Sequence, residues 1–254
     1  GIDSQPKQIV INAYVINYID YGQGPPLLLL HGLNFGWGQW YKNFLDLSKK
    51  HTVYAIDLPG SGWSSKVDFF NVNLERTFVD TVEMFIQKLN LKSTTIVAHS
   101  FGGWIAFKIA LNKRNEIKKM LLINPMGFFR DMPMEYRLVA SKSIANLLGK
   151  TVFRPSSDKI RKFLESSVAD KSCIDDEFVD YLVAMIKEDQ RSHPIHLISR
   201  LAGFFYIDEE LDIGSLLAEI KIPLFIVIGE YDKMTPYEKA ERLFSKVADA
   251  EVYT

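Results

Sequence analysis

One serine of this sequence stands where its hydroxyl could act as a nucleophile. Ser100, in "TIVAHSFGGWIAF", follows the apolar run "TTIVA" and precedes the apolar run "GGWIAFKIA". If the first run forms a strand and the second a helix, the chain turns sharply at the serine and exposes its side chain at the strand's carboxyl end. Such a turn needs small residues two positions before and after the serine. Ala98 and Gly102 occupy these positions, and Ala98 departs by one methyl group from the usual glycine.

A serine that attacks a carbonyl group needs donors for the oxyanion that forms. Two backbone N–H groups usually supply this stabilisation. The stretch "LLLLHGLNFGWGQW" ends a buried run at His31 and Gly32 and then enters a loop. We expect the N–H of Leu33, just past this pair, and the N–H of Phe101, next after the serine, to be the two donors.

A carboxylate is also placed where it could orient a catalytic histidine. "IVIGEYDKMTP" ends another buried run and brings Asp232 into the following loop. A carboxylate there can accept the N–H of a histidine and stabilise the imidazolium that forms when the serine loses its proton. Glu230 is the nearby competitor, and we favour Asp232 because it lies further beyond the strand end.

Alternating strands and helices must position these groups. The runs "KQIVI", "AYVINYID" and "PLLLLHG" predict extended segments near the N-terminus, and "TVYAIDLPG", "TTIVAHS", "KKMLLINP" and "IPLFIVIGE" predict strands buried on both faces. Residues 73–89 predict an amphipathic helix with Asn73 as its N-cap. This alternation predicts a mostly parallel sheet with helices on both faces.

The alternation stops near Gly127 and resumes near Ile222. Between these points the sequence reads as helices: "MEYRLVASKSIANLLGK", "SDKIRKFLESSVA", "DDEFVDYLVAMIKED" and "HPIHLISRLAGFF". We interpret residues 128–212 as a helical lid inserted into a core formed by residues 1–127 and 213–254. Aromatic residues of this segment could line an acyl pocket or simply pack.

The motifs "HGL", "DLPGSGWS", "AHSFGG" and "GEYDKMTP", in this order, resemble the α/β-hydrolase family. The resemblance implies the α/β-hydrolase fold, Ser100 as nucleophile, Asp232 as the acid of a catalytic triad, and oxyanion donors at Leu33 and Phe101. It implies a structural role for Asp57 in "DLPGSG". A serine at the elbow argues against the haloalkane dehalogenase and epoxide hydrolase branches, which use aspartate there.

The histidine of the triad is the missing member. The resemblance places it after the last strand, but no histidine follows Asp232 in this sequence. "AEVYT" resembles the start of that strand, so we expect the rest of the strand, the last helix and the histidine beyond Thr254.

The histidines of the chain are weak substitutes for the missing base; they are His31, His51, His99, His193 and His196. His31 belongs to the oxyanion loop, His51 begins a strand at the far end of the sheet, and a sharp elbow would point His99 away from the serine. His193 and His196 flank a proline of the lid and lack further metal ligands, so we expect packing or substrate contact there.

Composition limits the other possibilities. The chain has 254 residues, 30 Lys+Arg against 31 Asp+Glu, and a single cysteine, Cys173. Without a basic stripe we expect no nucleic-acid partner, and without a long apolar run no stable membrane insertion. One cysteine and no targeting segment favour a cytoplasmic protein. We expect no metal and no cofactor.

The leading interpretation is a serine hydrolase that acts on a small-molecule acyl substrate, an ester, thioester or related carbonyl compound, through an acyl-enzyme. The same site could cleave a carbon–carbon bond or transfer the acyl group to an alcohol. The alternative from another class is a ligand-binding or regulatory protein of the same fold without a complete triad.

Overall fold

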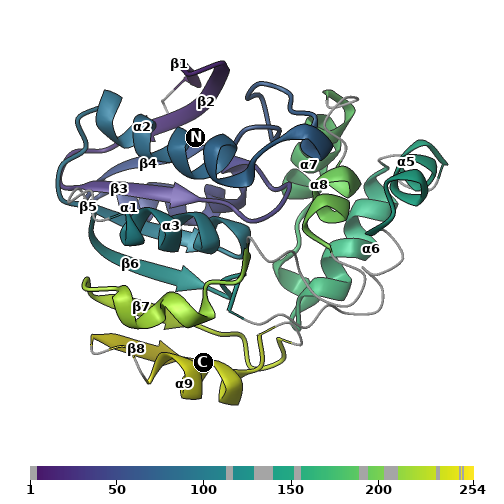
Figure 1. The fold of residues 1–254 in the computed structure, drawn as a ribbon. Coiled ribbons are helices and arrows are strands. Elements are labelled where there is room, and N and C mark those ends of the chain that lie inside the picture. The colour runs from purple at the N-terminus through teal and green to yellow at the C-terminus, as the bar shows by residue number, and fades with distance from the viewer. Residues whose placement is uncertain are drawn as a thin grey trace.

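A computed structural model describes residues 5–112, 117–128, 140–151, 156–188, 194–202, 211–232, 235–245, 247 and 249–254. Within these residues, one sheet of eight strands forms the centre of the protein (Figure 1). The strands are β1 (Lys7–Ile11), β2 (Tyr14–Tyr21), β3 (Pro26–Leu30), β4 (Thr52–Ile56), β5 (Thr94–His99), β6 (Ile117–Ile123), β7 (Leu224–Val227) and β8 (Ala250–Tyr253).

The order across the sheet is β1-β2-β4-β3-β5-β6-β7-β8. The strand β2 pairs antiparallel with both β1 and β4, and all other neighbours pair in parallel. The predicted mostly parallel sheet is therefore confirmed. "AEVYT" does form a strand, β8, which pairs with β7 at the sheet edge.

Each face of the sheet carries its own apolar cluster because successive side chains of a strand point to opposite faces. Leu27 and Leu29 of β3 pack with Phe44 of helix α1 (Tyr41–Ser48) on one face. Leu28 and Leu30 belong to the larger cluster on the other face. Helices α2 (Asp80–Lys88), α3 (Phe101–Leu111) and α9 (Tyr237–Phe244) contribute to that second cluster. This arrangement confirms the prediction of helices on both faces.

The helix expected over residues 73–89 begins as predicted but is not uniform. The Asn73 side chain accepts a hydrogen bond from the Arg76 N–H at 2.8 Å, as an N-cap does. One turn of π-helix, Glu75–Val79, then precedes α2. Phe78 within this turn is buried and packs edge-on against the ring of Phe101 at 4.9 Å.

Helices occupy the described part of the segment between β6 and β7. They are α5 (Lys142–Thr151), α6 (Ser157–Ser167), α7 (Asp176–Glu188) and α8 (Pro194–Leu201). Figure 1 shows them beyond the ends of the strands. The four helices expected there are present, while the role of residues 128–212 as a lid stays a prediction.

Candidate active site

Ser100 occupies a strained turn between β5 and α3. Its backbone has φ 51° and ψ −115°, in the left-handed half of conformational space that a non-glycine residue adopts only at a cost of about 1–3 kcal/mol. Three hydrogen bonds hold this turn. The Ser100 N–H donates to the Ile123 carbonyl at 3.0 Å, and the Ser100 carbonyl accepts from Gly103 at 2.9 Å and from Met126 at 3.0 Å.

Helix α3 approaches the end of β3 so closely that a side chain would not fit. A Cβ at Gly102 would lie 2.6 Å from the Leu30 carbonyl oxygen and 2.7 Å from that of His31. Ala98, on the other side of the serine, is fully buried in the core. The small residues that the sequence places around Ser100 therefore bring the end of β3 against the elbow.

This contact brings the loop after β3 to the serine. The Phe101 N–H lies in the first turn of α3, where no carbonyl of the helix can accept from it. Leu33 follows Gly32, and Gly32 donates its own N–H to Oε1 of Gln39 at 2.9 Å. Both expected oxyanion donors thus lie on segments that meet beside Ser100.

Asp232 lies in the loop after β7 and is held by two donors. Its Oδ1 accepts from the Thr235 N–H at 2.8 Å, and its Oδ2 accepts from the side-chain amide of Asn124. Glu230, the competing carboxylate, is exposed to solvent, whereas Asp232 is partly buried. The structure therefore favours Asp232 over Glu230 for a role inside the site.

Asn124 connects Asp232 to the serine. It follows β6 directly, and the preceding residue, Ile123, accepts the N–H of Ser100. Strands β5, β6 and β7 are parallel neighbours, so Ser100, Asn124 and the Asp232 loop lie together at one edge of the sheet, the edge formed by the carboxyl ends of these strands. His99 shares this edge, since the Asp232 carboxylate acts on the pKa of its ring.

Sequence reasoning missed Asn124 and Gln39. A signal for Asn124 was available, because a polar residue directly after the buried run "KKMLLI" stands where the parallel strands present their functional groups. Gln39 lies in a single turn of 3-10 helix, Trp37–Trp40, and no pattern in the sequence distinguishes it from the other glutamines.

Asp57 plays a different part from Asp232. It is completely buried and accepts hydrogen bonds from the Trp37 N–H at 2.7 Å, the Trp63 N–H at 3.0 Å and the Asn17 amide at 2.8 Å. Burial raises the pKa of this carboxyl to about 6, and the three donors oppose the rise. The carboxylate ties together three separate segments, which agrees with the structural role implied by the resemblance.

His31 is a structural histidine. It is almost fully buried; its Nε2 accepts from the Leu58 N–H at 3.0 Å, and its Nδ1 lies 2.6 Å from the Gly32 carbonyl oxygen. Burial lowers the pKa of His31 to about 4, so the ring is neutral at neutral pH. With both ring nitrogens engaged, His31 is a poor candidate for the base.

The remaining histidines are placed as follows. Burial also lowers the pKa of His99 to about 4, and its Nδ1 lies 2.8 Å from the amide nitrogen of Gln39. His51 precedes β4 at the opposite edge of the sheet, as expected. His196 packs against the Phe70 ring at 5.1 Å. His193 lies outside the described residues.

The helical segment contacts the loop after β3 through α7. The Tyr181 hydroxyl accepts a hydrogen bond from the Gly38 N–H at 3.1 Å. The Tyr181 ring packs against Trp37 and Trp63, with centroid distances of 6.1 and 5.6 Å. A Cβ at Gly36 would lie 2.3 Å from the Tyr181 hydroxyl. The loop that carries Leu33 therefore packs directly against α7.

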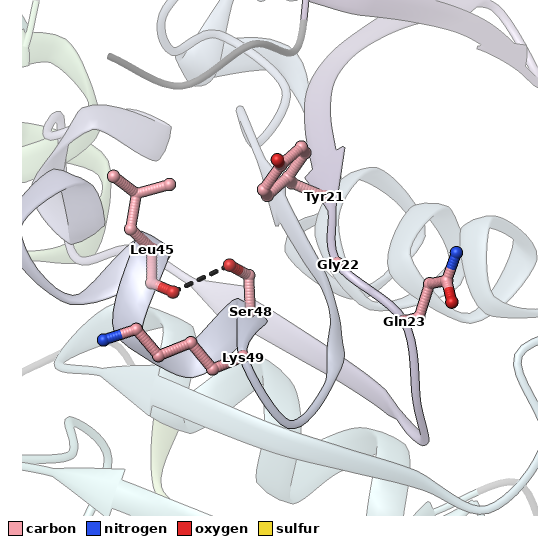
Figure 2. A pocket seen from close by; sticks show the side chains of 6 residues that line it. All are labelled: Tyr21, Gly22, Gln23, Leu45, Ser48 and Lys49. Atoms are coloured by element: carbon pink, nitrogen blue, oxygen red, sulfur yellow. Dashed lines mark hydrogen bonds between the residues drawn. The ribbon is translucent and has the colours of Figure 1, made fainter.

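An open depression lies where the parallel strands begin, at the end of the sheet away from Ser100. Tyr21, Gly22 and Gln23 at the end of β2 line it, together with Leu45, Ser48 and Lys49 of the α1 region (Figure 2). The Ser48 hydroxyl donates to the Leu45 carbonyl at 2.7 Å within the helix. Parallel strands start at this edge, so it lies far from the groups at their carboxyl ends.

In the described ranges, no three or more histidine, cysteine, aspartate or glutamate side chains gather as a metal site. Over the same ranges, no helix combines the length and apolarity that crossing a bilayer requires.

A protein-family model described as "alpha/beta hydrolase fold" matches residues 25–253. Among solved structures, the epoxide hydrolase VrEH1 from Vigna radiata superimposes with a TM-score of 0.81 at 18% sequence identity, over 99% of this chain and 90% of that one. At this level of identity the likeness shows the fold. The predicted α/β-hydrolase fold is thus confirmed.

Two curated relatives share more sequence over a shorter region. The "1-acylglycerol-3-phosphate O-acyltransferase ABHD5" of Rattus norvegicus is 37% identical over 105 residues, which is 41% of this chain and 30% of the relative. The "Abhydrolase domain-containing protein abhd-5.2" of Caenorhabditis elegans is 35% identical over 105 residues, 41% of this chain and 24% of the relative. The similarity thus covers less than a third of the length of either relative.

Proposed function

We propose that this chain, which belongs to the α/β-hydrolase fold family, is a serine hydrolase that cleaves an ester, thioester or related carbonyl substrate through an acyl-enzyme. The observation that carries the proposal is the backbone of Ser100. A serine is held at φ 51° between a buried strand and a helix, with Gly102 against the end of β3. Strain of this kind is typical of a nucleophile presented to a substrate.

The proposed reaction proceeds in two steps. The Ser100 hydroxyl oxygen bonds to the carbonyl carbon while a histidine base takes the hydroxyl proton. The Leu33 and Phe101 N–H groups stabilise the negative oxygen. The tetrahedral species then collapses, and the leaving alcohol or thiol carries away the proton from the histidine. Water attacks the acyl-enzyme by the same route and releases the carboxylic acid.

The base in this proposal is the histidine that the family resemblance implies. Asp232, held by Asn124 and Thr235 at the same edge as Ser100, would orient its ring. His31 and His99 do not serve instead, because burial lowers the pKa of each ring to about 4 and a nitrogen of each is already engaged. A base works best with a pKa near the working pH.

A second candidate is acyl transfer to an alcohol in place of water. The rat relative is named as a 1-acylglycerol-3-phosphate O-acyltransferase, and the shared region is 37% identical. The acyl-enzyme is common to both reactions, so the acceptor alone separates them. This candidate makes the substrate an acyl lipid or acyl thioester.

The test uses protein made from the complete natural coding sequence and a fluorophosphonate probe. We expect the intact mass to rise by one probe in the wild type and in Ser93→Ala, and to stay unchanged in Ser100→Ala. Ser93 is a matched control, since it also has a positive φ of 53° but precedes β5 at the opposite edge. An unlabelled wild type would favour the non-catalytic, ligand-binding alternative.

If the wild type reacts with the probe, fresh enzyme is used to compare hydrolysis with acyl transfer. An acyl thioester is supplied with and without 1-acylglycerol-3-phosphate, and the products are separated by mass. Free acid alone indicates hydrolysis, whereas a diacylated product that depends on Ser100 indicates transfer.

A further inference from the structure

The Gln39 side chain lies between the loop after β3 and the end of β5. Its Oε1 accepts from the Gly32 N–H at 2.9 Å, and its Nε2 lies 2.8 Å from Nδ1 of His99. Gly32 precedes Leu33 by one residue, and His99 precedes Phe101 by two. One amide therefore joins the two segments that carry the proposed oxyanion donors.

The backbone fixes which way this amide faces. The Gly32 N–H can only donate, so the oxygen of Gln39 faces it and the amide nitrogen faces His99. Nδ1 of His99 must then accept, which places the proton of the neutral ring on Nε2. The contact is close, because a Cβ at Gly32 would lie 2.5 Å from this Nδ1.

Other hydrogen bonds hold the same loop elsewhere. The Trp37 N–H donates to Asp57, which follows β4, and the Gly38 N–H donates to Tyr181 of α7. These bonds fix the loop relative to β4 and to α7. Of the three, only the contact of Gln39 reaches β5, the strand that leads to the elbow.

We propose that Gln39 is a positioning residue for the oxyanion hole: by tying Gly32 to His99 it sets the spacing between the Leu33 and Phe101 N–H groups. This rests on the function proposed above. A misplacement of about 1 Å at a reacting group costs about 100-fold in rate. The spacing of the two N–H groups matters more for stabilising the oxyanion of the transition state than for binding the substrate. Loss of Gln39 therefore lowers kcat more than it raises KM.

Two substitutions separate this role from simple packing. Gln39→Met keeps the length of the side chain and removes both hydrogen bonds. Gln39→Glu keeps an acceptor for Gly32, but a carboxylate beside Nδ1 of His99 draws the ring proton to that nitrogen. The matched control is Gln87→Met, at an exposed glutamine of α2.

Three readouts are taken on protein from the complete coding sequence: kcat and KM for a p-nitrophenyl ester, the thermal midpoint, and the ¹⁵N signal of the His99 ring. We expect kcat of Gln39→Met to fall about 10- to 100-fold with KM within about threefold of the wild type. Gln87→Met should match the wild type. In Gln39→Glu, the Nδ1 signal should move to the protonated position and kcat should exceed that of Gln39→Met.

A kcat of Gln39→Met within about twofold of the wild type overturns the proposal. So does a His99 signal that Gln39→Glu leaves unmoved. If the thermal midpoint shows that Gln39→Met fails to fold, the kcat of Gln39→Glu and its His99 ring signal together test the proposal. A wild type that neither turns over the ester nor binds the fluorophosphonate contradicts the proposed function itself, which distinguishes that failure from a failure of Gln39.

Discussion

The same edge of the sheet carries two carboxylates in two different environments. Asp57, after β4, is fully buried and accepts three hydrogen bonds from Asn17, Trp37 and Trp63. Asp232, after β7, is partly buried and lies beside Asn124 and the loop residue Thr235. Full burial with several donors suits a carboxylate that joins segments, whereas partial burial at the carboxyl ends of the strands, where Ser100 also lies, suits a carboxylate that orients a catalytic group. Substitutions can test this contrast.

The largest effect is expected at Asp232. Asp232→Asn should lower kcat about 10⁴-fold, because an amide cannot hold the base in the required tautomer. The free energy of unfolding should change by less than about 1 kcal/mol, since the site is partly exposed. Steady-state kinetics and urea denaturation measure the two quantities. Normal turnover in this variant would remove Asp232 from the proposed site.

Gly62, in the loop of Asp57, and Gly229, in the loop of Asp232, should differ in how substitution by alanine changes stability. A Cβ at Gly62 would lie 2.2 Å from the Asp57 carboxylate, and Gly62 has φ +54°. Gly62→Ala should therefore lower the free energy of unfolding by about 2–4 kcal/mol. At Gly229 the nearest atom would lie 3.7 Å away, so Gly229→Ala should leave stability unchanged or raise it by up to about 1 kcal/mol. Equal losses in both variants would contradict the contrast.

Asp57→Asn should destabilise the fold by about 2–3 kcal/mol. The new amide turns its own N–H groups toward buried donors, so at least one of the Trp63, Trp37 and Asn17 groups loses its acceptor. The folded variant should keep its labelling by fluorophosphonate, because Asp57 does not touch the reacting atoms. Asp232→Asn, measured in parallel, serves as its control.

A pH dependence of stability is expected from His31. Burial lowers its folded-state pKa to about 4 from the ordinary 6.5, so the unfolded chain binds the proton more readily and the contribution of His31 to stability falls as pH drops from 6.5 toward 4. Between pH 6.5 and 4.5 the loss is about 2 kcal/mol. The stability of His31→Gln should fall less steeply over this range, and His51→Gln is the control. Parallel curves for wild type and His31→Gln would refute this assignment.

Asp57 acts in the opposite direction over an overlapping range. Burial raises its pKa from 3.8 to about 6, so the folded state keeps the proton longer than the unfolded chain does. Its contribution to stability therefore falls as pH rises from about 4 to 6. The pH curve of Asp57→Asn should accordingly rise more steeply toward neutral pH than that of the wild type.

Local patterns predicted the individual strands and the elbow because both depend on neighbours in the chain. The apolar runs gave the strands, and the small residues at Ala98 and Gly102 indicated the turn at Ser100. The contacts that assemble the edge are long-range. Tyr181 meets Gly38 across 143 positions, and no local pattern encodes such a meeting.

Long-range contacts also explain the other features that the sequence did not predict. Gln39 and His99 meet because the 3-10 turn Trp37–Trp40 lies against the end of β5, and the π-helical turn at Glu75–Val79 appears where Phe78 packs against Phe101. The roles of Ser100 and Asp232 stay predictions, although the geometry at both suits them.

The position of β3 has a consequence for biosynthesis. Pro26–Leu30 pairs with β4 on one side and with β5 on the other, although β5 begins more than 60 residues later in the chain. A ribosome adds about 5–20 residues per second, so this leucine-rich segment waits for several seconds without its second neighbour. During that interval its four leucines are available to a chaperone that recognises extended apolar chain. We expect this nascent segment to be a site of chaperone contact during synthesis.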